Sequence, residues 1–241
     1  MSSRRWLLTA FAALVAVVLS MAGRAAAVTL GAVDDFQTGT TAGWGGGATL
    51  SNVASSGPAG AGDGALSVVA SGRVAIVNTA QWTGNFAAAG ITQIVVDVRH
   101  ANAFPLELRL GLASGVVGSG GSGDTYVSAN AVAVANDGLW HRVALGVSAA
   151  DFVPHPANSN PAPSAAAALA NVSHFRILHN PAANFLGANG PATFFLDNIR
   201  AVPEPAGICL WMVGIFALAR GLRRRRSSAW GSAMGAGATG R

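Results

Sequence analysis

The sequence predicts an all-β fold, a two-sheet antiparallel sandwich of the jelly-roll type, for residues 28–201. Short segments alternate between apolar and polar residues with a period of two, which is typical of half-buried strands. Clusters of Gly, Asn, Pro and Ser separate these segments, and the main helix signal is Ser164, which can cap a short turn at 165–170. The expected strands cover residues 28–36, 48–54, 65–70, 73–80, 91–99, 105–113, 125–134, 139–147, 173–179 and 193–201.

The clearest strand is Pro105–Ala113, where leucines alternate with Glu, Arg and Gly. Ile91–Arg99 shows the same alternation, with Ile94, Val96 and Val98 on one side. Because side chains on a strand point alternately to its two faces, each segment should turn its apolar residues to the core. The leucines expected there are Leu106, Leu108, Leu110 and Leu112.

These two strands follow one another across His100–Phe104, which predicts a hairpin. In one register Arg99 lies opposite Glu107 and Asp97 opposite Arg109, and each such pair contributes roughly 0.2–1 kcal/mol. The polar face of the hairpin is then either a solvated surface or the floor of a ligand groove.

The net charge of +5 comes from the ends of the chain. Residues 28–201 hold six arginines and nine acidic residues, so the predicted domain is weakly negative and has no basic stripe to neutralise phosphates. We therefore expect no nucleic-acid partner. The single cysteine, Cys209, lies outside the domain, which consequently has neither a disulfide nor a thiol nucleophile.

Residues 1–27 have the three parts of a secretory signal peptide. A pair of arginines precedes an apolar run at 6–21, and Ala25 and Ala27 supply a cleavage site of the A-x-A type. The pattern predicts export with cleavage after Ala27. The arginine pair also suits the twin-arginine route, and the two export routes stay open.

Residues 202–226 combine a rigid motif, an apolar run and a positive cluster. The prolines of Val202-Pro203-Glu204-Pro205 keep the chain extended. The apolar run approaches the roughly 20 residues of a membrane helix, and the arginines after it should stay cytoplasmic. These parts, in this order, resemble the PEP-CTERM sorting domain of Gram-negative bacteria that make exopolysaccharide. The positive cluster is Arg223, Arg224, Arg225 and Arg226.

This resemblance implies partners and a location. In the PEP-CTERM family a membrane-embedded cysteine transpeptidase, the exosortase, processes the protein at the Pro-Glu-Pro motif. We therefore expect the export machinery and an exosortase as partners, a transient inner-membrane intermediate, and a final place on the outer surface or in the extracellular matrix. The tail 227–241, which we expect to be disordered, departs from the family pattern, which ends at the arginines. The alternative is a membrane anchor without processing.

Short motifs in residues 28–201 carry a second resemblance. Asp34-Asp35-Phe36 precedes Gly43-Trp44, Gly138-Leu139-Trp140-His141-Arg142-Val143 comes later, and Phe195-Leu196-Asp197-Asn198-Ile199 closes the domain. The layout resembles jelly-roll domains related to carbohydrate-binding modules and galactose-binding-like domains. It implies a lectin-like sandwich, often with a structural Ca²⁺ that joins the first and last strands.

Four aspartates are candidate ligands for such a Ca²⁺, which takes about six to eight oxygens from carboxylates and carbonyls. Asp34 or Asp35 and Asp197 lie at the two ends of the domain, and Asp63 lies in a glycine-rich turn. The alternative is that they are polar residues at strand ends.

Sugar binding uses aromatic rings that stack on the sugar, with polar groups that fix its orientation. Trp44, before three glycines, and Trp82, at a strand end, are candidate ligand-binding residues, with core packing as the alternative for both. Trp140 has apolar neighbours, so we assign it to the core.

Catalytic signatures are weak. A glycosidase needs two carboxylates across a cleft, and nothing in the sequence supports Asp35 with Asp97 or Asp197 as that pair. We therefore expect no enzyme, but an exported, surface-sorted protein that binds or organises extracellular polysaccharide in the cell envelope or biofilm matrix. The alternatives are a purely structural surface protein without sugar affinity and a glycan hydrolase.

Overall fold

The structure, a computed structural model, describes residues 27–115, 124–155 and 164–203. Apart from Pro203, these residues belong to one unit that ends at Val202. The predicted signal peptide, sorting signal and tail lie outside the described residues, except for Ala27, Val202 and Pro203. Among the described residues, no helix has the length and apolar character that a membrane crossing requires.

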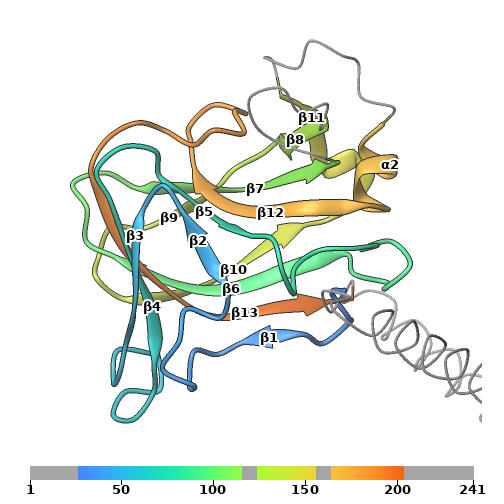
Figure 1. The fold of residues 1–241 in the computed structure, drawn as a ribbon. Coiled ribbons are helices and arrows are strands. Elements are labelled where there is room, and N and C mark those ends of the chain that lie inside the picture. Colours follow the sequence, from blue (N-terminus) through green and yellow to red (C-terminus); the bar gives the residue numbers. More distant parts are fainter. Residues whose placement is uncertain (1–26, 116–123, 156–163, 204–241) are drawn as a thin grey trace, which may run out of the picture. The chain divides into compact units, whose positions relative to one another are not determined.

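Two antiparallel sheets pack face to face (Figure 1), which confirms the predicted two-sheet sandwich of jelly-roll type. Sheet A has the strand order β10-β6-β13-β4-β3, and β1 pairs with β13 beside this path. Its strands are β10 (Trp140–Gly146), β6 (Gln93–His100), β13 (Ala192–Val202), β4 (Ala65–Ala70), β3 (Thr49–Val53) and β1 (Val33–Asp34).

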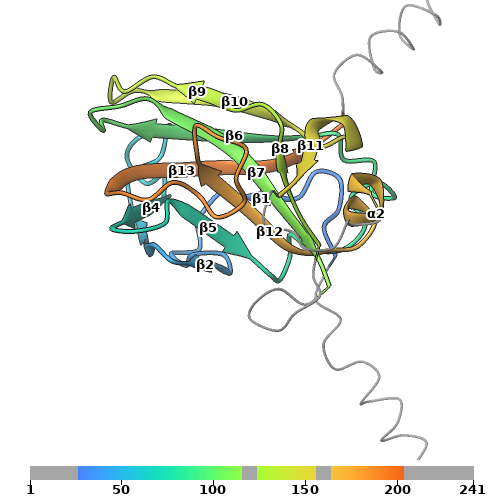
Figure 2. The same ribbon diagram turned by 90° about the horizontal axis from the view of Figure 1, so that it is seen from above.

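Sheet B has the order β11-β8-β7-β12-β5-β2, and β9 pairs with β7 beside this path. A 3-10 turn, η1 (Ala149–Asp151), lies between β10 of sheet A and β11, and a short helix, α2 (Ala165–Leu169), lies between β11 and β12 (Figure 2). The strands are β11 (Phe152–Pro154), β8 (Asp124–Ser128), β7 (Leu106–Ser114), β12 (Val172–His179), β5 (Ala75–Asn78), β2 (Trp44–Gly46) and β9 (Val132–Val134).

The core lies between the inner faces of the two sheets. All four leucines of the β7 alternation are fully buried there, as are Ile94, Val96 and Val98 of β6. A buried side chain of this size contributes about 1.5–3 kcal/mol relative to an exposed one. The strict alternation therefore fixes which face of each strand points inward.

The predicted hairpin between β6 and β7 is wrong. The chain crosses from sheet A to sheet B between them, so β6 pairs with β10 and β13 while β7 pairs with β8, β9 and β12. Asp97 lies opposite Arg142 rather than Arg109. The same alternation satisfies both arrangements, because it specifies an inward face without specifying which sheet supplies that face. No shared polar floor therefore forms from Asp97, Arg99, Glu107 and Arg109.

Smaller differences concern strand ends and short strands. The segment expected as one strand at 125–134 is two, β8 and β9, and only Val33–Asp34 of 28–36 is a strand. The three-residue strands β2 and β11 were not predicted. The Ser164 cap is confirmed, since its Oγ accepts a hydrogen bond of 3.1 Å from the Ala167 N–H.

Candidate functional site

Three large side chains form a row across the outer face of sheet A. Trp140 of β10 lies opposite Arg99 of β6, and Arg99 lies opposite Phe195 of β13. The Arg99 guanidinium carbon is 5.0 Å from the centroid of the Trp140 ring and 4.6 Å from that of Phe195. All three side chains are half-buried, so the row presents two aromatic rings with a cation between them on a solvent-facing surface.

The local sequence sets this orientation. On β13, Phe194 and Leu196 are fully buried, so Phe195 between them must point outward. On β10, Val143 and Leu145 point to the core, and Trp140 has the opposite parity. Gly138, which precedes β10, adopts a φ of 76° that favours glycine and donates a 2.9 Å hydrogen bond to the His100 carbonyl.

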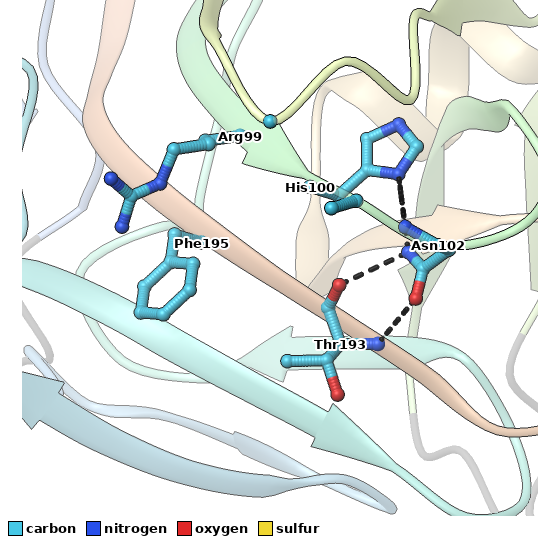
Figure 3. Close-up of a pocket in the computed structure, with 7 residues that line it drawn as sticks. Arg99, His100, Asn102, Thr193 and Phe195 are labelled. Carbon is cyan, nitrogen blue, oxygen red and sulfur yellow. Dashed lines mark hydrogen bonds between the residues drawn. The ribbon is translucent and has the colours of Figure 1, made fainter.

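A pocket of about 290 Å³ opens beside this row, at the end of β6 and the start of β13. Figure 3 shows Arg99 and Phe195 on one side of it, with His100, Asn102 and Thr193 linked by hydrogen bonds on the other. The Asn102 amide donates to the Thr193 carbonyl at 3.0 Å and accepts from the Thr193 N–H at 2.9 Å. The pocket is lined by Arg99, His100, Ala101, Asn102, Gly138, Thr193 and Phe195.

A second polar row crosses the same face next to the first. Arg142 makes a two-point ion pair with Asp97, with N···O distances of 2.8 and 3.0 Å. The Asn198 amide donates at 3.0 Å both to Asp97 and to Asp197, which lie opposite each other. Asn198 can bridge them because the strand bulges here and its φ is 50°.

Asp197, one of the four metal candidates, is fully buried. Burial raises the pKa of its carboxyl to about 7, the Asn198 N–H opposes this, and the negative charges of Asp63, Asp97 and Asp35 raise the pKa further. Both carboxylate oxygens accept hydrogen bonds from Asn198, and no cation pairs with Asp197 among the described residues.

The other three aspartates occupy two different environments. Asp63 and Asp35 are joined through Gln37, whose side chain donates to the Asp63 carboxylate at 2.6 Å and to the Asp35 carbonyl at 2.9 Å. The Asp34 carboxylate instead accepts hydrogen bonds from the indole N–H groups of Trp44 and Trp82. Within the described ranges no three His, Cys, Asp or Glu side chains form a metal-holding group.

The structure places Trp44 and Trp82 in the core, which corrects their assignment as sugar-stacking residues. Trp44 is 3% exposed and Trp82 fully buried, and both pack against Phe175 with ring centroids 6.0 and 5.5 Å away. Their indole N–H groups donate to Asp34 at 2.7 and 2.6 Å. Neither ring has a face open to a sugar, so the alternative of core packing holds for both.

The assignment of Trp140 to the core is also corrected, since its ring lies in the outer row. This row was not predicted from the sequence, although the sequence contains a usable signal. Trp140 shares strand parity with Arg142 and Ala144, whereas Val143 and Leu145 alternate with it. The row can bind through aromatic stacking and charged hydrogen bonds, which is recognition chemistry rather than bond cleavage.

Some solved structures are similar to this chain at low sequence identity. No protein-family model matches the chain, and no curated protein matches it. A family 11 carbohydrate-binding module of Clostridium thermocellum, in complex with a β-1,3-1,4-mixed-linked tetrasaccharide, is similar at 20% identity and TM-score 0.48, covering 73% of this chain and 98% of its own.

Two further solved structures are similar over most of the described residues. The CBM22-1 xylan-binding domain from Paenibacillus barcinonensis matches at 16% identity and TM-score 0.39, over 73% of this chain and 99% of its own. An exo-β-agarase matches at 12% identity and TM-score 0.48, over 71% of this chain and 25% of its own. Because all three TM-scores are below 0.5, the site is interpreted from its own residues.

Proposed function

We propose that this protein is an exported, surface-sorted, non-catalytic protein that binds polysaccharide through the outer face of sheet A. The observation that carries the proposal is the row of Trp140, Arg99 and Phe195 beside a polar pocket. Aromatic rings and a few oriented polar groups are what a sugar ring requires of a protein surface. Export, sorting by an exosortase, the inner-membrane intermediate and a place in the exopolysaccharide matrix rest on the terminal sequence motifs alone.

The spacing of the two rings supports a polymer as the ligand. Trp140 and Phe195 lie on strands separated only by β6, so they stand about 10 Å apart at the usual strand spacing. This is close to the length of a β-linked disaccharide. A chain that crosses the strands can therefore contact both rings, and its neighbouring units can reach the pocket.

The carboxylates do not favour hydrolysis. Asp97 is 5% exposed and Asp197 fully buried, and Asn198 bridges the two. A glycosidase needs both of its carboxyl groups in contact with the scissile bond. This pair is closed to a sugar in the described sandwich, which supports binding without cleavage.

We also retain a structural Ca²⁺ as a proposal, with an altered ligand set. Asp34 is occupied by the two indole N–H groups, so it is not a ligand candidate. The remaining ligand candidates are Asp35, Asp63 and Asp197. Backbone carbonyl oxygens would have to complete the coordination shell of the Ca²⁺. A bound Ca²⁺ would neutralise charge there and join the first and last strands. Native mass spectrometry that finds no Ca²⁺ on a Ca²⁺-equilibrated chain would contradict this.

The test of the binding proposal is retention of the full chain on immobilised exopolysaccharide from the producing organism, with Ca²⁺ and with chelator. Trp140→Ala and Phe195→Ala should each weaken retention about tenfold, which corresponds to about 1.4 kcal/mol of binding free energy. Leu139→Ala is the matched control, because Leu139 is 64% exposed and adjacent to Trp140 but outside the row. Equal retention of all three variants, or none by the unmodified chain, would overturn the proposal.

A further inference from the structure

Arg99 carries a positive charge that no acidic side chain balances in the described part of the chain. The other arginine close to the row, Arg142, is neutralised by its two-point pair with Asp97. Among the described residues, no carboxylate lies within ion-pair distance of Arg99. Its contacts are the two rings, and no described hydrogen bond uses its five N–H donors. The centre of the proposed binding face is therefore an unpaired cation.

The two rings also fix the orientation of this cation. A guanidinium that lies against aromatic rings keeps its N–H groups in its own plane, where they remain free to donate. Holding the side chain between Trp140 and Phe195 removes rotamer freedom before a ligand arrives. A planar guanidinium with free edges matches a carboxylate, which accepts two parallel N–H···O bonds.

The pocket beside Arg99 can hold the sugar that carries such a group. Its volume of about 290 Å³ lies near the lower end of the range for small-molecule sites. Thr193, whose side chain is exposed, and the half-buried Asn102 line the side opposite Phe195. The Thr193 hydroxyl and the second lone pair of Asn102 Oδ1 can bind sugar hydroxyls while the guanidinium binds the charged substituent.

We propose that the polysaccharide bound at this face is acidic, and that Arg99 recognises the carboxylate of a uronic acid unit by a two-point ion pair. This inference deepens the proposed function and rests on it. Neutral polymers would lose the ion pair and leave the cation without a partner. Arg99 therefore determines specificity, whereas the rings supply contact area common to all sugars.

Arg200 offers a matched control for the charge. It lies on β13 opposite Val95, on the same outer face, and is exposed, but no described aromatic ring or carboxylate contacts it. Arg200→Gln and Arg99→Gln remove the same charge from the same face. The arginines near the chain ends are unchanged in both variants, so their attraction to an acidic polymer cancels in the comparison.

The experiment measures binding of the full chain to polygalacturonate and to its carboxyl-reduced form, at about 0.15 M salt. We expect the unmodified chain and Arg200→Gln to prefer the acidic polymer about tenfold, as one charge-assisted pair predicts. Arg99→Gln should lose this preference, and Arg99→Lys should keep only part of it because lysine lacks the planar fork. Thermal unfolding of each variant establishes that it is folded.

The outcomes separate the two proposals. Equal binding of both polymers by the unmodified chain, abolished by Trp140→Ala, would overturn the acidic-ligand inference and leave the binding function intact. Equal losses in Arg99→Gln and Arg200→Gln would also overturn it, because general charge would then explain the preference. Binding to neither polymer by a chain that is still retained on the producing organism's exopolysaccharide would overturn the acidic-ligand inference alone, whereas loss of all three interactions would contradict both proposals.

Discussion

Two tryptophan environments in this sandwich differ in burial and in the groups that contact the ring. Trp44 and Trp82 lie inside the core, packed against Phe175 and hydrogen-bonded to one carboxylate, Asp34. Trp140 lies on the outer face of sheet A beside Arg99. The indole N–H groups and ring faces of the inner pair find their partners within the core. For the ring of Trp140, the described partner is the Arg99 guanidinium. The inner pair therefore stabilises the core, whereas Trp140 is placed for the recognition that we propose at the outer face of sheet A.

The largest difference between the two environments is expected in the free energy of unfolding. Trp82→Ala removes a fully buried ring that packs on Trp44 and Phe175. Such a truncation costs about 3–5 kcal/mol of unfolding free energy. Urea denaturation of Trp82→Ala beside Trp140→Ala measures the contrast, and we expect the second variant to lose about 1 kcal/mol or less. Similar losses in both would contradict the assignment of the two environments.

A loss of similar size is expected when the carboxylate shared by the inner pair is removed. Asp34→Ala leaves two buried indole N–H groups without an acceptor, and each unsatisfied donor costs about 1–3 kcal/mol. Asp34→Asn keeps an acceptor oxygen and should lose less. Unfolding free energies of the two variants provide the check, and an equal loss would mean that the indole hydrogen bonds contribute little.

The smallest expected effect is a pH dependence of stability, which comes from histidines outside both tryptophan environments. Burial lowers the pKa of His179, whose Nδ1 accepts the Glu107 N–H at 2.8 Å, with opposing contributions from Glu107. A histidine with a lowered folded-state pKa binds protons more readily when unfolded, so its contribution to stability is lost as pH falls below about 6.5. His155 and His174 shift in the same direction.

Asp197, whose pKa is raised to about 7, contributes stability that grows as pH falls over the same range, so the histidine contribution has to be measured against a variant. We expect the melting temperature of the unmodified chain to fall relative to that of His179→Asn between about pH 6.5 and pH 5. Circular dichroism melts across this range measure it. A slope that the variant leaves unchanged would assign the acid sensitivity to the other histidines.

Part of this architecture was predictable from the sequence, and the reason is local. The leucines of β7 and the alternation of β6 specify inward faces, so strand positions and the sandwich class followed. The pairing of β6 with β10 and β13 did not follow, because both sheets contribute apolar inner faces of the same kind. The Asp97–Arg142 pair was missed for the same reason.

The candidate site was harder to predict because tryptophan suits a core and a sugar platform equally well. Glycine neighbours suggested exposure for Trp44, although its strand β2 places the ring inside. Apolar neighbours suggested burial for Trp140, although parity with Arg142 turns it outward. Only pairing across β10, β6 and β13 brings Trp140, Arg99 and Phe195 together, and no segment of the sequence contains all three.

The most direct test of the central claim is tryptophan oxidation by N-bromosuccinimide, mapped by mass spectrometry on the folded full chain with and without bound exopolysaccharide. The account predicts that Trp140 reacts in the free protein and is protected by the polysaccharide, while Trp44 and Trp82 stay unreactive in both states because they are buried. Polysaccharide that binds and leaves Trp140 as reactive as before would contradict the claim that the outer face of sheet A is the binding site.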